Sequence, residues 1–219
     1  VIALGLTSWV PGMAPVALRK RRMWGDIKEG LIYTKKNRTV LVLLLVALST
    51  ALLAMPFRTL LPVQIEEVFK LEVEALGLML SMIGIGALIG SLVIAGLSKN
   101  SRRGWVLLVT SMLSGAAILL AAVTTSYAVA LVIMVILGLG DSGRRALNSS
   151  LIMEQTDDEH RGRVMGVYMM NFGLIPLGAL PLGFISAFLD VRIAFALAGG
   201  GLLAAAIGYT VLTDKIRQL

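Results

Sequence analysis

An acid and two arginines stand at helical spacing inside a long apolar segment. Asp141 is followed three and four residues later by Arg144 and Arg145, a spacing that places the three side chains on one helix face, within reach of ion pairing. A carboxylate in such surroundings can carry a proton or bind a substrate. The alternative is a structural ion pair whose arginines extend toward the nearest polar surface. The sequence leaves both interpretations open.

Two amides and a third arginine stand in similar surroundings. Asn148 continues the stripe of Asp141, and Asn171 lies in a later apolar run; each amide either contacts a substrate or hydrogen-bonds a neighbouring helix. Arg58 follows 19 uncharged residues. That distance places it near the far end of its segment, where we expect an anchor at the boundary with polar surroundings. A role in a substrate pathway is the alternative.

Motifs for enzyme catalysis and metal binding are missing from the sequence. The chain has no cysteine, which excludes thiolate metal sites and a cysteine nucleophile. Its one histidine, His160, stands in a charged segment, where we expect it to be solvated. The string GLGDSG at 138–143 matches the dinucleotide fingerprint, but that fingerprint requires a preceding strand. The sequence therefore predicts neither an enzyme nor a cofactor or metal site.

The elements that hold these residues are long apolar runs. Hydrophobic residues make up 57% of the 219 residues and charged residues 15%, compared with about 45–50% and 25% in soluble domains. A membrane-crossing helix needs about 20 apolar residues, and the chain offers six runs of that kind. The predicted spans are 39–62, 75–97, 104–123, 127–151, 164–189 and 193–212. The predicted fold class is an all-α polytopic membrane protein.

Basic residues in the connections predict how these spans are oriented. Alternate connections hold 15 lysines and arginines on one side, and Lys70 and Arg192 on the other. Loops rich in basic residues stay in the cytoplasm, so we expect both ends of the chain there. This pattern accounts for the net charge of +7 without a nucleic-acid partner. The basic side includes the loop residues Lys99, Arg102, Arg103, Arg161 and Arg163.

The residues before the first span form two further segments. Residues 1–18 are apolar but interrupted by prolines, and we expect them to be the end of a preceding membrane helix. Residues 19–38 are predicted to form a cytoplasmic linker with an amphipathic helix on the membrane surface; a solvated linker is the alternative. Residues 39–219 then form the six-helix membrane domain.

Small residues predict where the helices touch. Because lipid supplies no hydrophobic force between helices, close contact depends on small side chains. We expect such contacts at Gly86, Gly90, Gly200 and Ala204. Kinks are expected at the prolines of the first and fifth spans, which are Pro56, Pro62, Pro176 and Pro181. Six spans divide into two triplets of opposite orientation, a 3+3 inverted repeat of the kind found in secondary transporters.

The stretch from Glu154 to Pro181, EQTDDEHRGRVMGVYMMNFGLIPLGALP, carries a family resemblance. It resembles the loop and helix between the tenth and eleventh spans of bacterial exporters of the major facilitator superfamily, in the branch that contains the enterobactin exporter. Arg161, Gly162 and Arg163 match the R-G-R segment of that loop. The basic segment before the first span is similar to the central cytoplasmic loop of the same branch.

The resemblance implies that the chain is the C-terminal half of a twelve-span transporter in the bacterial inner membrane. The implied partners are a small-molecule substrate, the lipid bilayer and an N-terminal half that precedes this sequence. The implied function is proton-coupled export of a small amphipathic compound, either drug-like or siderophore-like. A six-span membrane subunit that transports nothing, and an importer of the same superfamily, are the alternatives. Lys99 stands where the family often has an acid, whereas Arg102 and Arg103 fit its basic pair.

Overall fold

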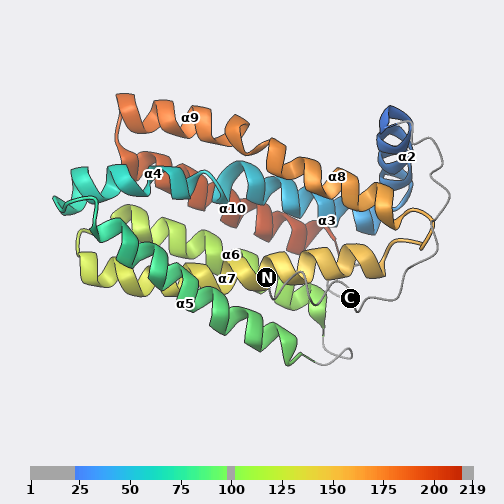
Figure 1. Cartoon of the computed structure of the whole chain (residues 1–219), viewed down its shortest axis with the longest axis horizontal. Coiled ribbons are helices and arrows are strands. Elements are labelled where there is room, and N and C mark those ends of the chain that lie inside the picture. Colours follow the sequence, from blue (N-terminus) through green and yellow to red (C-terminus); the bar gives the residue numbers. More distant parts are fainter. Residues whose placement is uncertain (1–22, 98–101, 214–219) are drawn as a thin grey trace, which may run out of the picture.

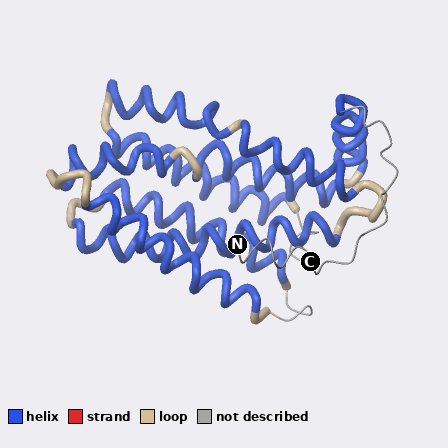
Figure 2. Tube along the Cα trace, viewed as in Figure 1, coloured by secondary structure: helices blue, strands red, loops and turns tan. Residues whose placement is uncertain are grey.

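The computed structural model describes residues 23–97 and 102–213. Throughout these residues the regular structure is helical, with no strand (Figure 2), which confirms the predicted fold class. The expected end of a preceding helix at 1–18, the basic residues 19–22 and the loop residue Lys99 lie outside the described residues.

The helices follow one another with short connections. They are α2 (Met23–Lys36), α3 (Arg38–Ser49), η1 (Thr50–Ala54), α4 (Phe57–Gln64), η2 (Ile65–Phe69), α5 (Ala75–Ala95), α6 (Arg103–Val123), α7 (Tyr127–Glu154), α8 (Arg161–Gly173), α9 (Ile175–Phe188) and α10 (Val191–Leu212). The elements η1 and η2 are short π-helical turns, and the others are α-helices.

Six stretches of the described chain are long and apolar enough to cross a membrane, as predicted. Four of them are the single helices α5, α6, α7 and α10. The other two are composite. The first span, Arg38–Phe69, joins α3, η1, α4 and η2, and the fifth span, Arg161–Phe188, joins α8 and α9.

The first span bends where its hydrogen-bond pattern changes. In η1 the N–H of Met55 donates to the carbonyl of Thr50 at 3.0 Å, five residues back rather than four. Pro56 follows and has no N–H for the ladder, and α4 starts after it. The kink expected at Pro56 is therefore present, whereas Pro62 lies inside α4. The span ends at Phe69 and is capped by Lys70, whose φ of 55° is left-handed.

The fifth span is broken at Leu174. The helix α8 ends at Gly173, and α9 begins with Pro176 in its first turn, where the missing N–H of a proline removes no helical hydrogen bond. The break thus comes where Pro176 predicts it. Pro181, in contrast, lies inside α9.

The spans pair as an inverted repeat requires. The helix α5 packs along α7, and the fifth span packs along the first span (Figure 1). The helices α6 and α10 pack on each other, and α6 contacts α7 as α10 contacts the first span. If the first, second and third spans are exchanged with the fourth, fifth and sixth, these pairs of neighbours stay the same. The packing of α9 on α10 is the exception, because α5 and α6 make no contact of similar extent in the described part of the chain.

Glycines set the closest contact between α5 and α7. A Cβ added to Gly86 of α5 would overlap the carbonyl of Val135, and one added to Gly138 of α7 would overlap the carbonyl of Ile83. Gly90 lies against α7 in the same way. The contacts expected at Gly86 and Gly90 are confirmed.

In α10 the closest contact lies one residue away from the prediction. A Cβ added to Gly199 would stand 2.8 Å from the carbonyl oxygen of Gly115 in α6, whereas Gly200 has more room and Ala204 is exposed. The expected contact of Ala204 is therefore wrong. Small residues surround much of α10, so their spacing alone does not select a face; the buried Phe195 orients the helix toward the core.

The bundle core holds α4 in place. The ring of Phe57 packs on that of Phe195, with centroids 4.5 Å apart. Gln64 is fully buried and donates to the carbonyl of Ala121 at 2.7 Å. These two contacts fix α4 at both of its ends.

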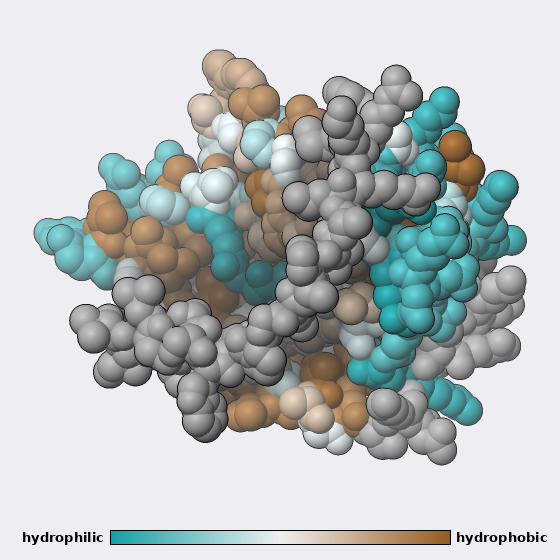
Figure 3. Space-filling view, turned by 45° about the vertical axis from the view of Figure 1, so that its right-hand side comes forward, coloured by the Kyte–Doolittle hydropathy of each residue, from teal (hydrophilic) through white to brown (hydrophobic). Residues whose placement is uncertain are grey.

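The connections alternate between the two ends of the bundle. The helix α2 and the α7–α8 connection lie at one end, and the α6–α7 and α9–α10 connections lie at the other (Figure 1). Hydrophilic residues gather toward the end that carries α2 (Figure 3). The described basic residues of this end are Lys28, Lys35, Lys36, Arg38, Arg102, Arg103, Arg161 and Arg163. That this end faces the cytoplasm stays a prediction.

The helix α2 is fastened to the α7–α8 connection. Tyr33 Oη donates to the carboxylate of Asp157 at 3.0 Å, and the Tyr33 ring stacks on His160 with centroids 4.4 Å apart. His160 is therefore partly covered rather than solvated, because α2 lies over it. Leu31 and Ile32, in contrast, are exposed, so α2 turns these two apolar side chains away from the bundle.

Candidate functional site

Asp141 lies at the centre of a cluster of three arginines. Its carboxylate pairs with Arg145 at 3.0 Å, with Arg58 at 3.2 Å and with Arg144. Arg144 and Arg145 come from α7 itself, at the predicted spacing, and Arg58 comes from α4 in the first span. Three guanidiniums against one carboxylate leave this guanidinium cluster with two positive charges.

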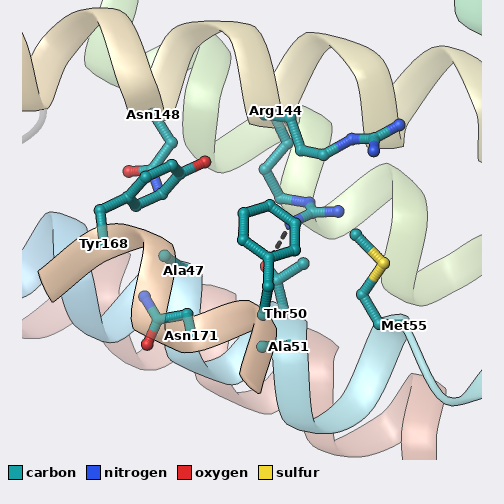
Figure 4. A pocket seen from close by; sticks show the side chains of 10 residues that line it. Ala47, Thr50, Ala51, Met55, Arg144, Asn148, Tyr168 and Asn171 are labelled. Carbon is teal, nitrogen blue, oxygen red and sulfur yellow. Dashed lines mark hydrogen bonds between the residues drawn. The ribbon is translucent and has the colours of Figure 1, made fainter. Parts of the chain in front are cut away.

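The members of the guanidinium cluster differ in burial. The side chain of Arg144 is 2% exposed and that of Asp141 8%, whereas those of Arg58 and Arg145 are 38% and 39% exposed. Arg144 also donates to the hydroxyl of Thr50 in η1 (Figure 4). Arg144 is thus the buried partner of Asp141, and the other two arginines reach the open surface.

A groove opens beside the guanidinium cluster, between the first span, α7 and α8. The space among its lining atoms is about 340 Å³ when the open solvent at its mouth is included. The residues that line it are Ala47, Thr50, Ala51, Met55, Arg144, Arg145, Asn148, Tyr168, Asn171 and Phe172 (Figure 4). Apolar walls with a few polar groups are typical of small-molecule sites.

The two amides predicted from the sequence both line this groove. Asn148 is 3% exposed, and its Oδ1 has no hydrogen-bond partner in the described part of the chain. The same holds for Nδ2 of Asn171. Buried polar atoms are nearly always hydrogen-bonded, so two unpaired ones in residues that line one groove mark it as a candidate site.

Arg58 lies in the guanidinium cluster and not at the end of its span, where we expected an interface anchor. The expectation counted residues along a single α-helix. The first span continues beyond the predicted end to Phe69, so Arg58 lies well inside it. Its guanidinium donates a hydrogen bond to the carboxylate of Asp141 in α7.

Two aromatic side chains beside Asn171 form a wall that was not predicted from the sequence. The rings of Tyr168 and Phe172 meet edge to face, with centroids 6.2 Å apart. Tyr168, Asn171 and Phe172 fall within about one helical turn. Both aromatic residues could therefore have been predicted from their helical spacing to Asn171. Thr50 was also missed, because a lone hydroxyl in an apolar run usually bonds its own helix.

The predicted loop residues lie outside the groove. Arg103 pairs with Glu154 at the other end of the α6–α7 hairpin, and Arg102 is exposed before α6. Gly162 has open space around it. Lys99 is not among the described residues.

The R-G-R segment connects α8 to its neighbours. Arg161 pairs with Asp158 in the preceding loop. Arg163 pairs with two acids of α2, Asp26 at 3.3 Å and Glu29 at 3.1 Å. Arg163 therefore joins α2 to the fifth span, whereas Arg161 contacts the connection between α7 and α8.

The chemistry that the groove offers is binding. Within residues 23–97 and 102–213, no group of three histidine or acidic side chains could hold a metal ion. Guanidiniums, amides and aromatic rings can together hold a small molecule that has both charged and apolar parts.

Comparisons with known proteins also indicate a membrane transporter. The family model described as Major Facilitator Superfamily matches residues 37–217. Among curated proteins, the chain is similar to the Staphyloferrin A transporter of Staphylococcus aureus (strain NCTC 8325 / PS 47), with 26% identity over 161 residues. The match covers 74% of the chain and 40% of that relative, so the chain spans less than half of the relative's length. No solved structure matches the chain significantly.

Proposed function

The chain belongs to the major facilitator superfamily, a family of membrane transporters and not of enzymes, and we propose that it forms the C-terminal half of a twelve-span exporter. In this proposal an N-terminal half of the same transporter faces the groove. A small amphipathic compound crosses between the two halves by alternating access. The six spans lie in the bacterial inner membrane, with both ends of this half in the cytoplasm.

The groove is the observation that carries this proposal. Arg145, Asn148 and Asn171 bring polar groups into it from helices that are long and apolar enough to span the membrane. Polar groups at such positions are costly and usually mark a substrate or ion pathway. A membrane subunit that transports nothing has no use for such a groove, so transport is the better account.

Export and coupling to protons are proposed from the resemblance of residues 154–181 to the exporter branch. The Staphyloferrin A transporter supports a small-molecule substrate, and its name leaves the direction open. We assign Asp141 to the substrate site rather than to proton exchange, because guanidiniums engage both of its carboxylate oxygens. The proton carrier is then expected elsewhere in the full transporter.

The test uses the full-length protein in cells that lack it. Small molecules in the cells and in the medium are compared by untargeted mass spectrometry, with and without the transporter. We expect at least one compound to leave the cells only when the transporter is present. Everted membrane vesicles should then accumulate that compound when the vesicle interior is acidic, and a protonophore should stop the accumulation.

Two neighbouring residues of α8 give a matched pair of variants. Asn171→Leu changes the groove and should reduce export at least fivefold. Met170→Leu changes a side chain that is 50% exposed and does not line the groove, so export should be retained. If neither compound content nor vesicle uptake depends on the transporter, the proposed function is wrong. If the compound instead enters cells, the protein is an importer.

A further inference from the structure

We infer that a small anion, a compound with two or more carboxylates or comparable acidic groups, binds at the edge of the groove. It binds on the guanidinium of Arg145, which lines the groove, and on that of Arg58, which lies beside Arg145 on Asp141. The inference rests on the proposed transport function and names the substrate class of the same site.

The guanidinium cluster carries an excess of positive charge. Asp141 is the acid with which Arg58, Arg144 and Arg145 pair in the described part of the chain, and one carboxylate cannot neutralise three guanidiniums. Charges inside a membrane-spanning bundle are costly when they lack a counter-ion. A ligand with two negative charges would complete the balance.

The two exposed arginines of the cluster have N–H donors that Asp141 does not use. A guanidinium has five N–H donors. Arg58 and Arg145 each contact the same oxygen of Asp141, Oδ2, at 3.2 and 3.0 Å, so their guanidiniums lie side by side. Both side chains are more than one third exposed, which leaves donors on the open side. Forked donors of this kind bind carboxylates in a bidentate manner.

The rest of the groove fits the other end of such a molecule. Asn171 offers an amide nitrogen that has no partner among the described residues. Tyr168 and Phe172 form the aromatic wall, and Met55 adds an apolar side chain. The ligand that satisfies all of these groups is an amphipathic anion, with its acidic groups at the arginines and an apolar part against the rings.

A cationic substrate fits this site poorly. Both oxygens of Asp141 are already engaged, and the net positive charge of the cluster repels a cation. Replacing Asp141 with asparagine therefore separates the two substrate classes by the sign of its effect. Asp141→Asn should strengthen binding of an anion, and it would weaken binding of a cation that used this acid.

The experiment measures binding to the purified full-length protein in a neutral detergent by isothermal titration calorimetry. The probe is benzene-1,3,5-tricarboxylate, an aromatic ring with three carboxylates. Its uncharged trimethyl ester and benzyltrimethylammonium serve as the neutral and cationic counterparts. We expect only the tricarboxylate to bind. Asp141→Asn lowers stability, because it removes the counter-ion of Arg144, and it is therefore measured on the folded fraction recovered from size-exclusion chromatography. In that fraction the variant should bind the tricarboxylate roughly tenfold more tightly, because it removes the repulsion between the Asp141 carboxylate and the anion a few ångströms away.

Variants of the exposed arginines keep the test independent of folding. Arg58→Gln and Arg145→Gln change side chains that are more than one third exposed, and each should weaken tricarboxylate binding at least fivefold. Arg192→Gln, at the other end of the bundle, is the matched control and should bind as the wild type does. Unchanged binding in both cluster variants would overturn the inference.

The phosphate of a lipid headgroup offers the same chemistry as a free anion. Nanodiscs of phosphatidylcholine with and without phosphatidylglycerol distinguish the two sources. If phosphatidylglycerol binds in a manner that requires Arg58 and Arg145 while the tricarboxylate does not bind, the site is a lipid site and the inference is overturned. If the tricarboxylate binds equally well in both nanodiscs, the inference stands.

Failure of this inference is distinguishable from failure of the proposed function. The mass-spectrometric comparison identifies the exported compound whatever its charge. An exported compound that is neutral or cationic would leave the transporter function intact and remove the anion site. Tricarboxylate binding without any exported compound would keep the anion site and remove the transporter function.

Discussion

The guanidinium of Arg144 in α7 donates a hydrogen bond to the hydroxyl of Thr50 in the first span, and so bridges two spans that are 94 residues apart in the sequence. The same guanidinium pairs with Asp141. Because the Arg144 side chain is almost fully buried, both partners are needed to offset the cost of removing its charge from water.

Thr50→Val should lower the thermal stability of the full-length protein in detergent. The change keeps the volume of the side chain and leaves a buried Arg144 donor unpaired, at a cost of about 1–3 kcal/mol. Thr210→Val is the control, because the Thr210 hydroxyl bonds the carbonyl of Ala206 in its own helix. Equal unfolding midpoints for the two variants would show that the bridge adds no stability.

Asp141→Ala should destabilise the protein by about 3–5 kcal/mol, because it leaves the buried charge of Arg144 without its counter-ion. Adding Arg144→Met to this variant should restore much of the folded yield, measured by size-exclusion chromatography. Asp158→Ala, which removes an acid that is 86% exposed, should cost less than about 1 kcal/mol. A stable Asp141→Ala variant with Arg144 intact would mean that the ion pair is not structural.

Gly86→Ala should destabilise the bundle, because the added Cβ would overlap the carbonyl of Val135 and push α5 away from α7. Gly84→Ala is the matched control two residues away on the same helix, where a Cβ meets nothing within 4 Å. That change should be neutral or stabilise by up to about 1 kcal/mol through helix propensity. Thermal unfolding of the two variants measures the difference, and a Gly86→Ala midpoint at or above that of Gly84→Ala would contradict the packing.

Arg163→Gln should loosen α2 without unfolding the bundle, because the change removes the ion pairs with Asp26 and Glu29. Hydrogen–deuterium exchange of peptides covering residues 23–36 should become faster, while peptides of α6 keep their protection. Lys28→Gln, an exposed change on α2 itself, should leave the exchange unaltered. If α2 exchanges equally in both variants, these ion pairs do not hold it.

Cysteine labelling should place the two ends of the bundle on opposite sides of the membrane. Glu159→Cys lies in the α7–α8 connection and Val73→Cys at the other end; both positions are exposed. In a cysteine-free full-length protein, an impermeant maleimide added to intact cells should label position 73 and not position 159. The reverse pattern would invert the predicted topology. A cysteine at Ser101 would test the same side, but that residue lies outside the described part of the chain.

The membrane spans could be predicted from the sequence, because a helix that crosses lipid needs about 20 consecutive residues that are mostly apolar. Such a run is visible in the local composition alone. The uncharged runs located all six spans, and the spacing of Asp141, Arg144 and Arg145 located most of the guanidinium cluster. Helical spacing was sufficient there because the three residues share one helix.

The contacts between spans could not be read in the same way. Arg58 follows a π-helical turn and the bend at Pro56, and these change the face on which it meets Asp141. The contact between Thr50 and Arg144 joins two spans that lie 94 residues apart in the sequence. π-helical turns are rare, and nothing in the apolar run before Pro56 indicates one. The face of α10 was misassigned for a related reason, since several faces of that helix carry small residues.

The π-helical turn η1 determines the direction in which α4 points its side chains. One residue corresponds to about 100° of rotation in an α-helix, so the extra residue of a π-helical turn rotates everything after it by about that angle. With η1 converted to a regular α-helical turn, α4 would rotate about its own axis relative to α3, and Arg58 would point away from Asp141. The ion pair between Arg58 and Asp141 therefore depends on the hydrogen-bond register at Thr50–Ala54. A shift of that register would open the site on one side without any movement of α7.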